Sequence, residues 1–221
     1  GLLYQVVLEE AEARQDVGYM HKRLARAWRK YGESSGVNVS FRIGRHACLG
    51  GAWTMAAPCL LEAAEVAWQR GRSNELREAS RLAVRACSVD PSLGDIYGRA
   101  VLWFARSFEA QGEAKEAGQQ YARARGLCRE CDDRLGDIQA GIGQGWAALE
   151  CGDLAEAAVF YGDTMKASRA LKDLHLEALS IRGMAWLEQK KRNFEGADIL
   201  FTRVLNRSHQ LADARGMASA A

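Results

Sequence analysis

Hydrophobic residues recur at helical spacing along most of the chain. Between residues 100 and 124, apolar side chains return every three or four positions on both sides of a polar break at Gly112. The same arrangement surrounds Gly152 and Arg192 and, less regularly, Gly71. Apolar residues at this period form one face of an amphipathic helix, and such a face has to be covered by another helix. The pattern therefore predicts pairs of helices joined by short turns.

The polar breaks recur at nearly constant intervals. Gly71, Gly112, Gly152 and Arg192 are separated by 41, 40 and 40 residues. Glycine suits the left-handed backbone that ends a helix, and a small residue soon afterwards lets the next helix pack closely. Alanine follows three of the breaks by five residues, at Ala117, Ala157 and Ala197. After the first break, the small residue comes later, at Ala79. Aligning this copy with the other three therefore predicts an insertion of about three residues after Gly71.

A short phrase also recurs, as LGDIYGRA, LGDIQAGI, LKDLHLEA and LADARGMA, starting at residues 93, 135, 171 and 211. Each copy precedes the first helix of a predicted pair. An aspartate at the start of a helix accepts hydrogen bonds from the unpaired N–H groups there. The phrase therefore predicts that its aspartates are N-caps: Asp95, Asp137, Asp173 and Asp213.

The composition agrees with a helical fold and disfavours several classes of function. The 221 residues are 48% hydrophobic and include only two prolines, and the net charge of +2 gives no global field that would attract nucleic acid. There is no apolar run of about 20 residues and no secretory signal, so we expect a cytoplasmic protein without membrane contact. Because no acid and base recur at a catalytic spacing, we expect no enzyme activity.

The repeated unit resembles the tetratricopeptide repeat. Small, aromatic and glycine residues fall at that family's spacing in the best copy, at Ala105, Phe108, Gly112, Ala117, Tyr121 and Ala124. The resemblance covers residues 54–221 and implies an all-α, right-handed α-solenoid of antiparallel helical hairpins with a period of about 40. We expect this array to continue beyond residue 221. Residues 1–53 are expected to form an irregular helical linker or junction segment.

The amino-terminal region carries a second resemblance. It has the order His21, Arg23, Leu24 and Ala25, then Arg42 and His46, then Gly50 and Gly51, followed by an alanine-rich helix. This order is similar to the segment that joins the ATPase to the repeat array in bacterial STAND-type signalling ATPases, including repeat-bearing transcription activators and kinase-linked forms. The resemblance implies a sensor or scaffold region of such a protein. The phosphate loop GxxxxGK[ST] does not occur in these residues.

The tetratricopeptide resemblance also implies a concave groove, which the first helix of each hairpin lines. Carried over to this chain, the groove residues are Arg99, Leu102, Arg106, Glu109, Gln139, Ile142, Trp146, Leu149, Leu179, Arg182, Trp186 and Gln189. We expect this groove to bind a peptide, a protein or a neighbouring domain, as a non-catalytic interaction and regulatory module without a cofactor. A small-molecule effector site is an alternative, and an enzyme fragment is disfavoured. The indoles of Trp146 and Trp186 could instead pack between helices.

Two further motifs favour structural roles. In YMHKRLARAWRKY, the side chains at helical spacing are Met20, Leu24, Trp28 and Tyr31, which predicts a buried stripe opposite a basic face. Cys128 and Cys131 form a CxxC without a second ligand pair. We expect these two thiols to share a helix face and to fill the core rather than to bind zinc.

Overall fold

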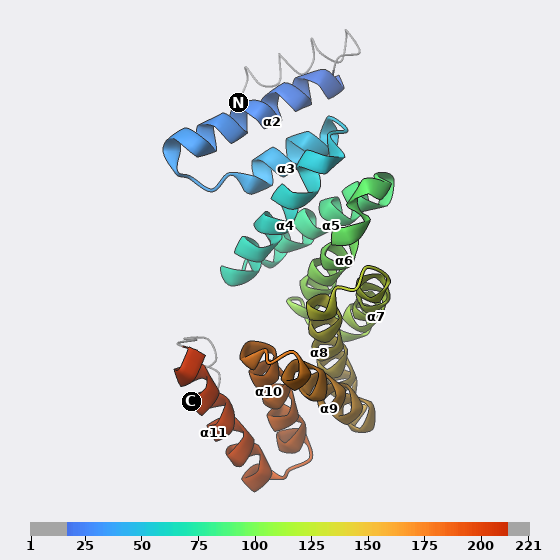
Figure 1. Cartoon of the computed structure of the whole chain (residues 1–221), viewed down its shortest axis with the longest axis vertical. Coiled ribbons are helices and arrows are strands. Elements are labelled where there is room, and N and C mark those ends of the chain that lie inside the picture. Colours follow the sequence, from blue (N-terminus) through green and yellow to red (C-terminus); the bar gives the residue numbers. More distant parts are fainter. Residues whose placement is uncertain (1–16, 212–221) are drawn as a thin grey trace. The chain divides into compact units, whose positions relative to one another are not determined.

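The computed structural model describes residues 17–211, with side-chain detail up to residue 209, and every regular element in that range is helical (Figure 1). Its elements are α2 (Val17–Ser35), α3 (Ser40–Leu49), α4 (Trp53–Gln69), α5 (Ser73–Val89), the short 3₁₀-helix η1 (Pro91–Leu93), α6 (Gly94–Glu109), α7 (Ala114–Glu130), α8 (Arg134–Cys151), α9 (Leu154–Ala170), α10 (Leu174–Lys190) and α11 (Phe194–Leu211). The predicted all-α class is confirmed over these residues.

The helices form two compact units that divide between Ser107 and Phe108. In the first unit, α2 packs on α3, α3 on α4, and α4 on α5. In the second unit each helix from α7 to α11 packs on the next along the chain, and α8 also packs on α10. Contacts between consecutive helices are those expected of hairpins laid side by side. The boundary proposed at residue 53 and the handedness of the solenoid stay predictions.

The turns inside the hairpins have the predicted left-handed backbone. Gly71, Gly112 and Gly152 have φ of 67°, 74° and 88°. Arg192 stands at the fourth break without glycine's freedom, and its φ is 62°. After Gly152 the N–H of Asp153 donates to the carbonyl oxygen of Ala148 at 2.9 Å, which is the bond that closes a Schellman turn. The hairpin geometry is therefore kept even where arginine replaces glycine.

The recurring aspartates divide into two groups. Asp173 is an N-cap as predicted, since its carboxylate accepts from the N–H of Leu176 at 2.9 Å. Asp95 and Asp137 lie inside the first turn of their helices, so the N-cap prediction is wrong for both. The cap of α8 is Asp133, which accepts from the N–H of Gly136 at 3.0 Å. The prediction for Asp213 lies outside the described residues.

The insertion predicted after Gly71 is also wrong. α5 begins two residues after Gly71, just as α7 begins two residues after Gly112. The alignment failed because Leu76 takes the buried place that Ala117 occupies in the later hairpin. The unit is longer only by one residue, in the connection after α5, which contains η1; there Asp90 accepts a hydrogen bond from the N–H of Ser92 at 3.0 Å.

In the second unit, buried tyrosine rings lie directly on glycines of neighbouring helices. Tyr121 of α7 is 1% exposed and lies against Gly143 of α8. One hairpin later, Tyr161 of α9 lies against Gly183 of α10 and also against Gly145 of α8. A Cβ atom at any of these glycines would overlap ring carbons. The absence of a side chain at these positions therefore sets how closely α8 and α10 approach the helices that carry the rings.

Adding one methyl group at this contact should destabilise the second unit. We predict that Gly183→Ala lowers the free energy of unfolding by about 1–3 kcal/mol, because the rigid ring of Tyr161 has to move. Gly162→Ala on α9 is the matched control, since its Cβ would meet open space, and it should stabilise the helix by up to about 1 kcal/mol. Urea unfolding followed by circular dichroism measures both. A Gly183→Ala protein as stable as the wild type would contradict this packing.

The buried line of α2 differs from the predicted stripe. Its buried residues are His21 and Ala25, while Met20, Leu24 and Trp28 are partly buried and Tyr31 is 50% exposed. The line is displaced because His21 pairs with a residue of α3, the helix on which α2 packs. The stripe prediction is therefore wrong for Tyr31, which instead contacts the Trp28 ring edge-on with centroids 5.7 Å apart.

The two histidines at the α2–α3 contact face each other directly. The Nδ1 atoms of His21 and His46 are 3.0 Å apart, and their rings stack with centroids 5.1 Å apart. Such a hydrogen bond needs one ring with an unprotonated Nδ1. Burial lowers the pKa of both histidines, and the nearby Arg45 guanidinium lowers both further, while in His46 the His21 ring contributes as well. The folded protein therefore favours neutral rings here.

Acid should weaken this contact. The unfolded histidines titrate near pH 6.5, above their folded pKa, so the unfolded state takes up protons first as the pH falls. The stability contributed by neutral rings is complete above about pH 6.5 and is lost below it. We predict that the loss in melting temperature between about pH 7 and pH 5 is smaller in His21→Gln than in the wild type. An unchanged slope in His21→Gln would refute the assignment.

Candidate functional site

The predicted groove residues of the first unit lie on α6. Arg99 is exposed, but Leu102 is only 2% exposed and belongs to the core, so its prediction as a groove contact is corrected. The Arg106 guanidinium lies over the ring of Trp103 at 4.5 Å and over that of Trp68 at 5.8 Å. These cation–π contacts hold Arg106 against two indoles of its own unit.

The second unit contains the other nine predicted residues. Leu149 of α8 is 4% exposed, so it supports the core and cannot line an open surface. The others keep accessible surface: Glu109 at the end of α6, then Gln139, Ile142 and Trp146 on α8, then Leu179, Arg182, Trp186 and Gln189 on α10. Since α8 and α10 pack on each other, most of the predicted set lies on two adjoining helices.

Trp186 is the most accessible aromatic residue of this set. It is 43% exposed, and its ring meets Phe201 of α11 edge-on with centroids 5.2 Å apart. Trp146 occupies the equivalent position one hairpin earlier and is partly buried. The alternative in which both indoles are enclosed between helices therefore does not hold for Trp186. One side of the Trp186 ring packs against Phe201, while the rest of the side chain keeps contact with solvent.

The polar groups around this surface favour hydrogen bonding over acid–base chemistry. The Tyr121 hydroxyl donates to the Glu109 carboxylate. Burial raises the pKa of Tyr161 well above its ordinary value, with the Glu109 carboxylate adding to the effect, so this phenol stays neutral. Lys190 and Glu150 link α10 and α8 by an ion pair of 3.9 Å at the exposed edge. These groups can donate and accept hydrogen bonds but do not form a nucleophile–base pair.

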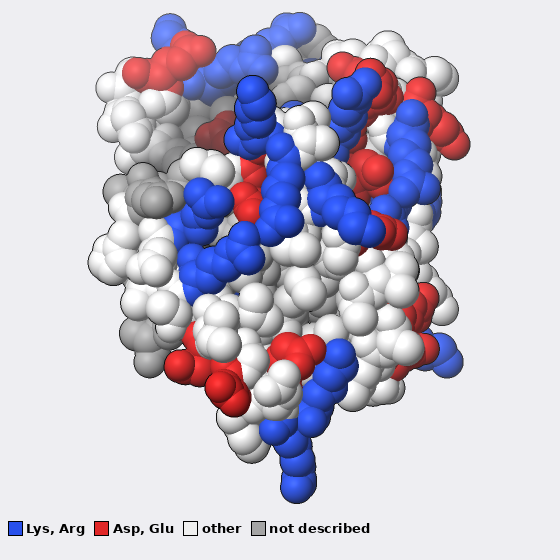
Figure 2. All heavy atoms as spheres, turned by 60° about the horizontal axis from the view of Figure 1, so that its bottom comes forward, with Lys and Arg blue, Asp and Glu red and all other residues white. Residues whose placement is uncertain are grey.

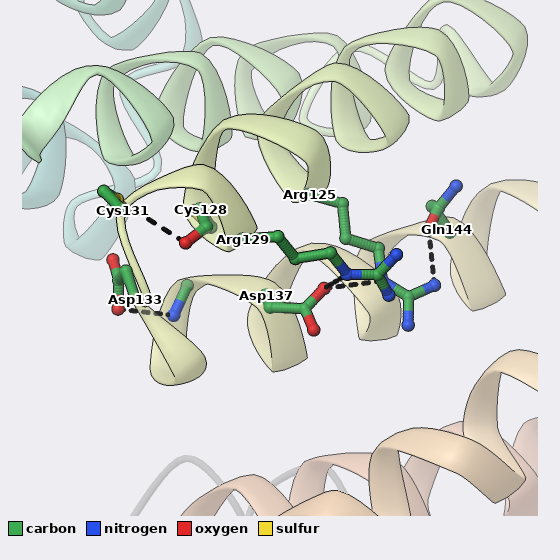
Figure 3. Close-up of polar contacts among 8 residues, drawn as sticks. Arg125, Cys128, Arg129, Cys131, Asp133, Asp137 and Gln144 are labelled. Carbon is green, nitrogen blue, oxygen red and sulfur yellow. Dashed lines mark hydrogen bonds and ion pairs between the residues drawn. The ribbon is translucent and has the colours of Figure 1, made fainter. Parts of the chain in front are cut away.

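The CxxC is divided between core and surface. Cys128 is fully buried, whereas Cys131 is exposed at the end of α7, so the prediction that both thiols share a buried face is wrong for Cys131. The Cys131 thiol lies 3.5 Å from the carbonyl oxygen of Cys128 (Figure 3). Within residues 17–211, no three His, Cys, Asp or Glu side chains are grouped so as to hold a metal ion.

Sequence reasoning missed a cluster of charged residues between α7 and α8. The Nε atoms of Arg125 and Arg129 lie 2.8 and 3.1 Å from the same Oδ1 atom of Asp137 (Figure 3). Arg125 also donates to the side-chain oxygen of Gln144 at 3.0 Å. Asp137 is thus held by two arginines of the preceding helix instead of capping its own helix.

A larger cluster surrounds Glu177, the residue 40 positions after Asp137. Glu177 is 4% exposed, and its carboxylate lies 2.8 Å from the Nε of Arg169, 3.4 Å from Arg207 and 3.7 Å from Arg203. The three arginines come from α9 and α11. The sequence held one indication of these two clusters: Asp137 and Glu177 are 40 residues apart, and so are Arg129 and Arg169. On the face drawn in Figure 2, Lys and Arg side chains are interspersed with Asp and Glu side chains.

No protein-family model matches the chain, and no curated protein matches it. Among the helices that the structure describes, none combines the length and the apolar composition required to span a bilayer. The resemblance to STAND-type ATPases stays a prediction from the motifs.

Removing the buried charge should weaken the second unit. We predict that Glu177→Gln lowers the free energy of unfolding by about 2 kcal/mol, since three arginines lose their shared carboxylate, although their partial exposure limits the cost. Glu150→Gln is the control, because its pair with Lys190 is exposed and long and should contribute less than about 0.5 kcal/mol. Chemical denaturation measures the difference. Equal effects of both variants would contradict a structural role for the buried carboxylate.

Proposed function

We propose that the second unit is a recognition module that binds an extended peptide or protein segment on the surface of α8 and α10, without catalysis. The observation that supports the proposal best is Trp186, which is 43% exposed and packs edge-on against Phe201. Aromatic residues of this kind supply a large share of the binding energy at protein interfaces. An indole that already packs on one side loses less conformational entropy when a partner covers it than a fully solvated one.

The neighbours of Trp186 on α10 suit recognition of a peptide. Arg182 precedes it by four residues and Gln189 follows it by three, which places both beside the indole on the helix surface. Their side chains can donate to peptide carbonyl and carboxylate groups, while the indole and the partly buried Ile142 of α8 offer apolar contact. The surface thus combines apolar and hydrogen-bonding groups.

The proposal does not include catalysis. The thiols whose ionisation is perturbed lie in the first unit, and their pKa values are shifted against reactivity. Burial raises the pKa of Cys48 and Cys59, and it raises that of Cys87 to about 11. A thiol with a raised pKa is a poor nucleophile near neutral pH.

The test begins with peptides selected against the whole chain from a displayed random library. We predict that peptides bound by the wild type lose at least about tenfold in affinity for Trp186→Ala, equivalent to about 1.4 kcal/mol. Ile199→Ala is the matched control: this side chain of α11 is 63% exposed and lies outside the predicted groove. Fluorescence anisotropy with labelled peptides measures each affinity.

Circular dichroism melting should show that both variants fold. Peptides that bind Trp186→Ala as tightly as the wild type, or that lose affinity equally for Ile199→Ala, would place the binding surface elsewhere. A selection that yields no specific peptide would count against the proposal itself.

A further inference from the structure

Arg106 of α6 is a partly buried cation whose described interactions are both with aromatic rings. Its guanidinium carbon lies 4.5 Å from the centre of the Trp103 ring, on the same helix, and 5.8 Å from the centre of the Trp68 ring, on α4. Within residues 17–209, no hydrogen bond or ion pair joins the Arg106 side chain to another residue. Cation–π contacts replace part of the hydration that burial removes, but they give the N–H donors of the guanidinium no acceptor.

The two indoles belong to the packed part of the first unit. Trp68 and Trp103 both lie against its hydrophobic core. Together with Arg106 they are partly buried rather than enclosed, so some surface of each residue stays accessible. Because the rings rest on the core, the guanidinium is positioned before any ligand arrives. Binding to it therefore costs less conformational entropy than binding to an arginine that is free in solvent.

Arg125 of α7 shows which group pairs with a guanidinium in a comparable setting in this protein. It also lies over an aromatic ring, that of Phe160, at 5.7 Å, and its Nε lies 2.8 Å from Oδ1 of Asp137 (Figure 3). Contact with an aromatic ring is thus compatible with a short ion pair to a carboxylate. Arg106 has two such rings, but among the described residues it has no carboxylate partner.

We propose that Arg106, Trp68 and Trp103 form a binding site for a peptide carboxylate, either the C-terminal group or an acidic side chain. A carboxylate is planar, carries one negative charge and offers two oxygens, which match the single charge and the paired N–H donors of a guanidinium. The apolar part of the ligand would contact the accessible surface of the indoles. The site lies in the first unit, so the inference does not depend on the peptide surface proposed for α8 and α10.

The experiment titrates the whole chain with N-acetylphenylalanine and, as the neutral control, with N-acetylphenylalanine amide. We predict that the acid shifts the indole N–H resonances of Trp68 and Trp103 saturably in nuclear magnetic resonance spectra, whereas the amide does not, because only the acid is charged at about pH 7. Arg106→Gln should weaken the affinity at least about tenfold, since a charge-assisted hydrogen bond is lost. Arg72→Gln is the matched control: it removes one positive charge from the same unit, at a 56% exposed side chain that pairs with Glu75.

A second probe, N-acetylglutamic acid α-amide, identifies the source of the carboxylate, because its only carboxylate is that of the side chain. Binding of N-acetylphenylalanine alone would support a site for a peptide C-terminus, and binding of the glutamate derivative would support a site that accepts acidic side chains. Circular dichroism checks that Arg106→Gln folds, and Arg106→Lys, which keeps the charge without the planar fork, should bind with intermediate affinity. Equal responses to N-acetylphenylalanine and its amide, no saturable response to either carboxylate, or an unchanged affinity in Arg106→Gln would overturn the proposal.

Discussion

The packing of tyrosine rings on bare helix backbone is the constraint on which the second unit depends. Tyr161 lies between Gly145 of α8 and Gly183 of α10, so a single ring determines the approach of two helices. Glycine inside a helix costs about 1 kcal/mol relative to alanine; α8 carries that cost at several positions and α10 at Gly183. Burial of an aromatic ring offsets it, at about 1.5–3 kcal/mol for a large apolar side chain. The helices are therefore stable in this arrangement rather than by their own propensity.

Much of this fold could be predicted because its determinants are local. The left-handed turns at Gly71, Gly112 and Gly152 follow from glycine, and the spacing of the breaks identified the hairpin even at Arg192, where a non-glycine residue adopts φ of 62°. Lys172 and Asp132, in the connections between hairpins, have φ of 55° in the same region. At these three positions hairpin packing outweighs the cost of about 1–2 kcal/mol for a left-handed L-residue.

The sequence could not show which aspartate caps each helix, because residues one helical turn apart lie on the same face. Asp137 stands four residues after the true cap Asp133, and four residues are close to one turn of 3.6 residues. The apolar face looks the same in both registers, so LGD at residue 135 matched LKD at residue 171 by composition. The ion pairs of Asp137 and Glu177 were not predicted either. Their arginine partners lie on other helices and come close only when the helices pack.

The candidate binding surface on α10 belongs to a helix that packs against its neighbours at several points. Near its start, Glu177 is held by arginines of two other helices; at its middle, Gly183 is fixed against Tyr161; and beyond that, Trp186 rests edge-on against Phe201. Three separate contacts thus fix the helix that presents the exposed indole. A side chain that is already immobile loses less entropy on binding than a mobile one, so more of its contact energy remains as affinity. The buried contacts of α10 are therefore what make its exposed face suitable for recognition.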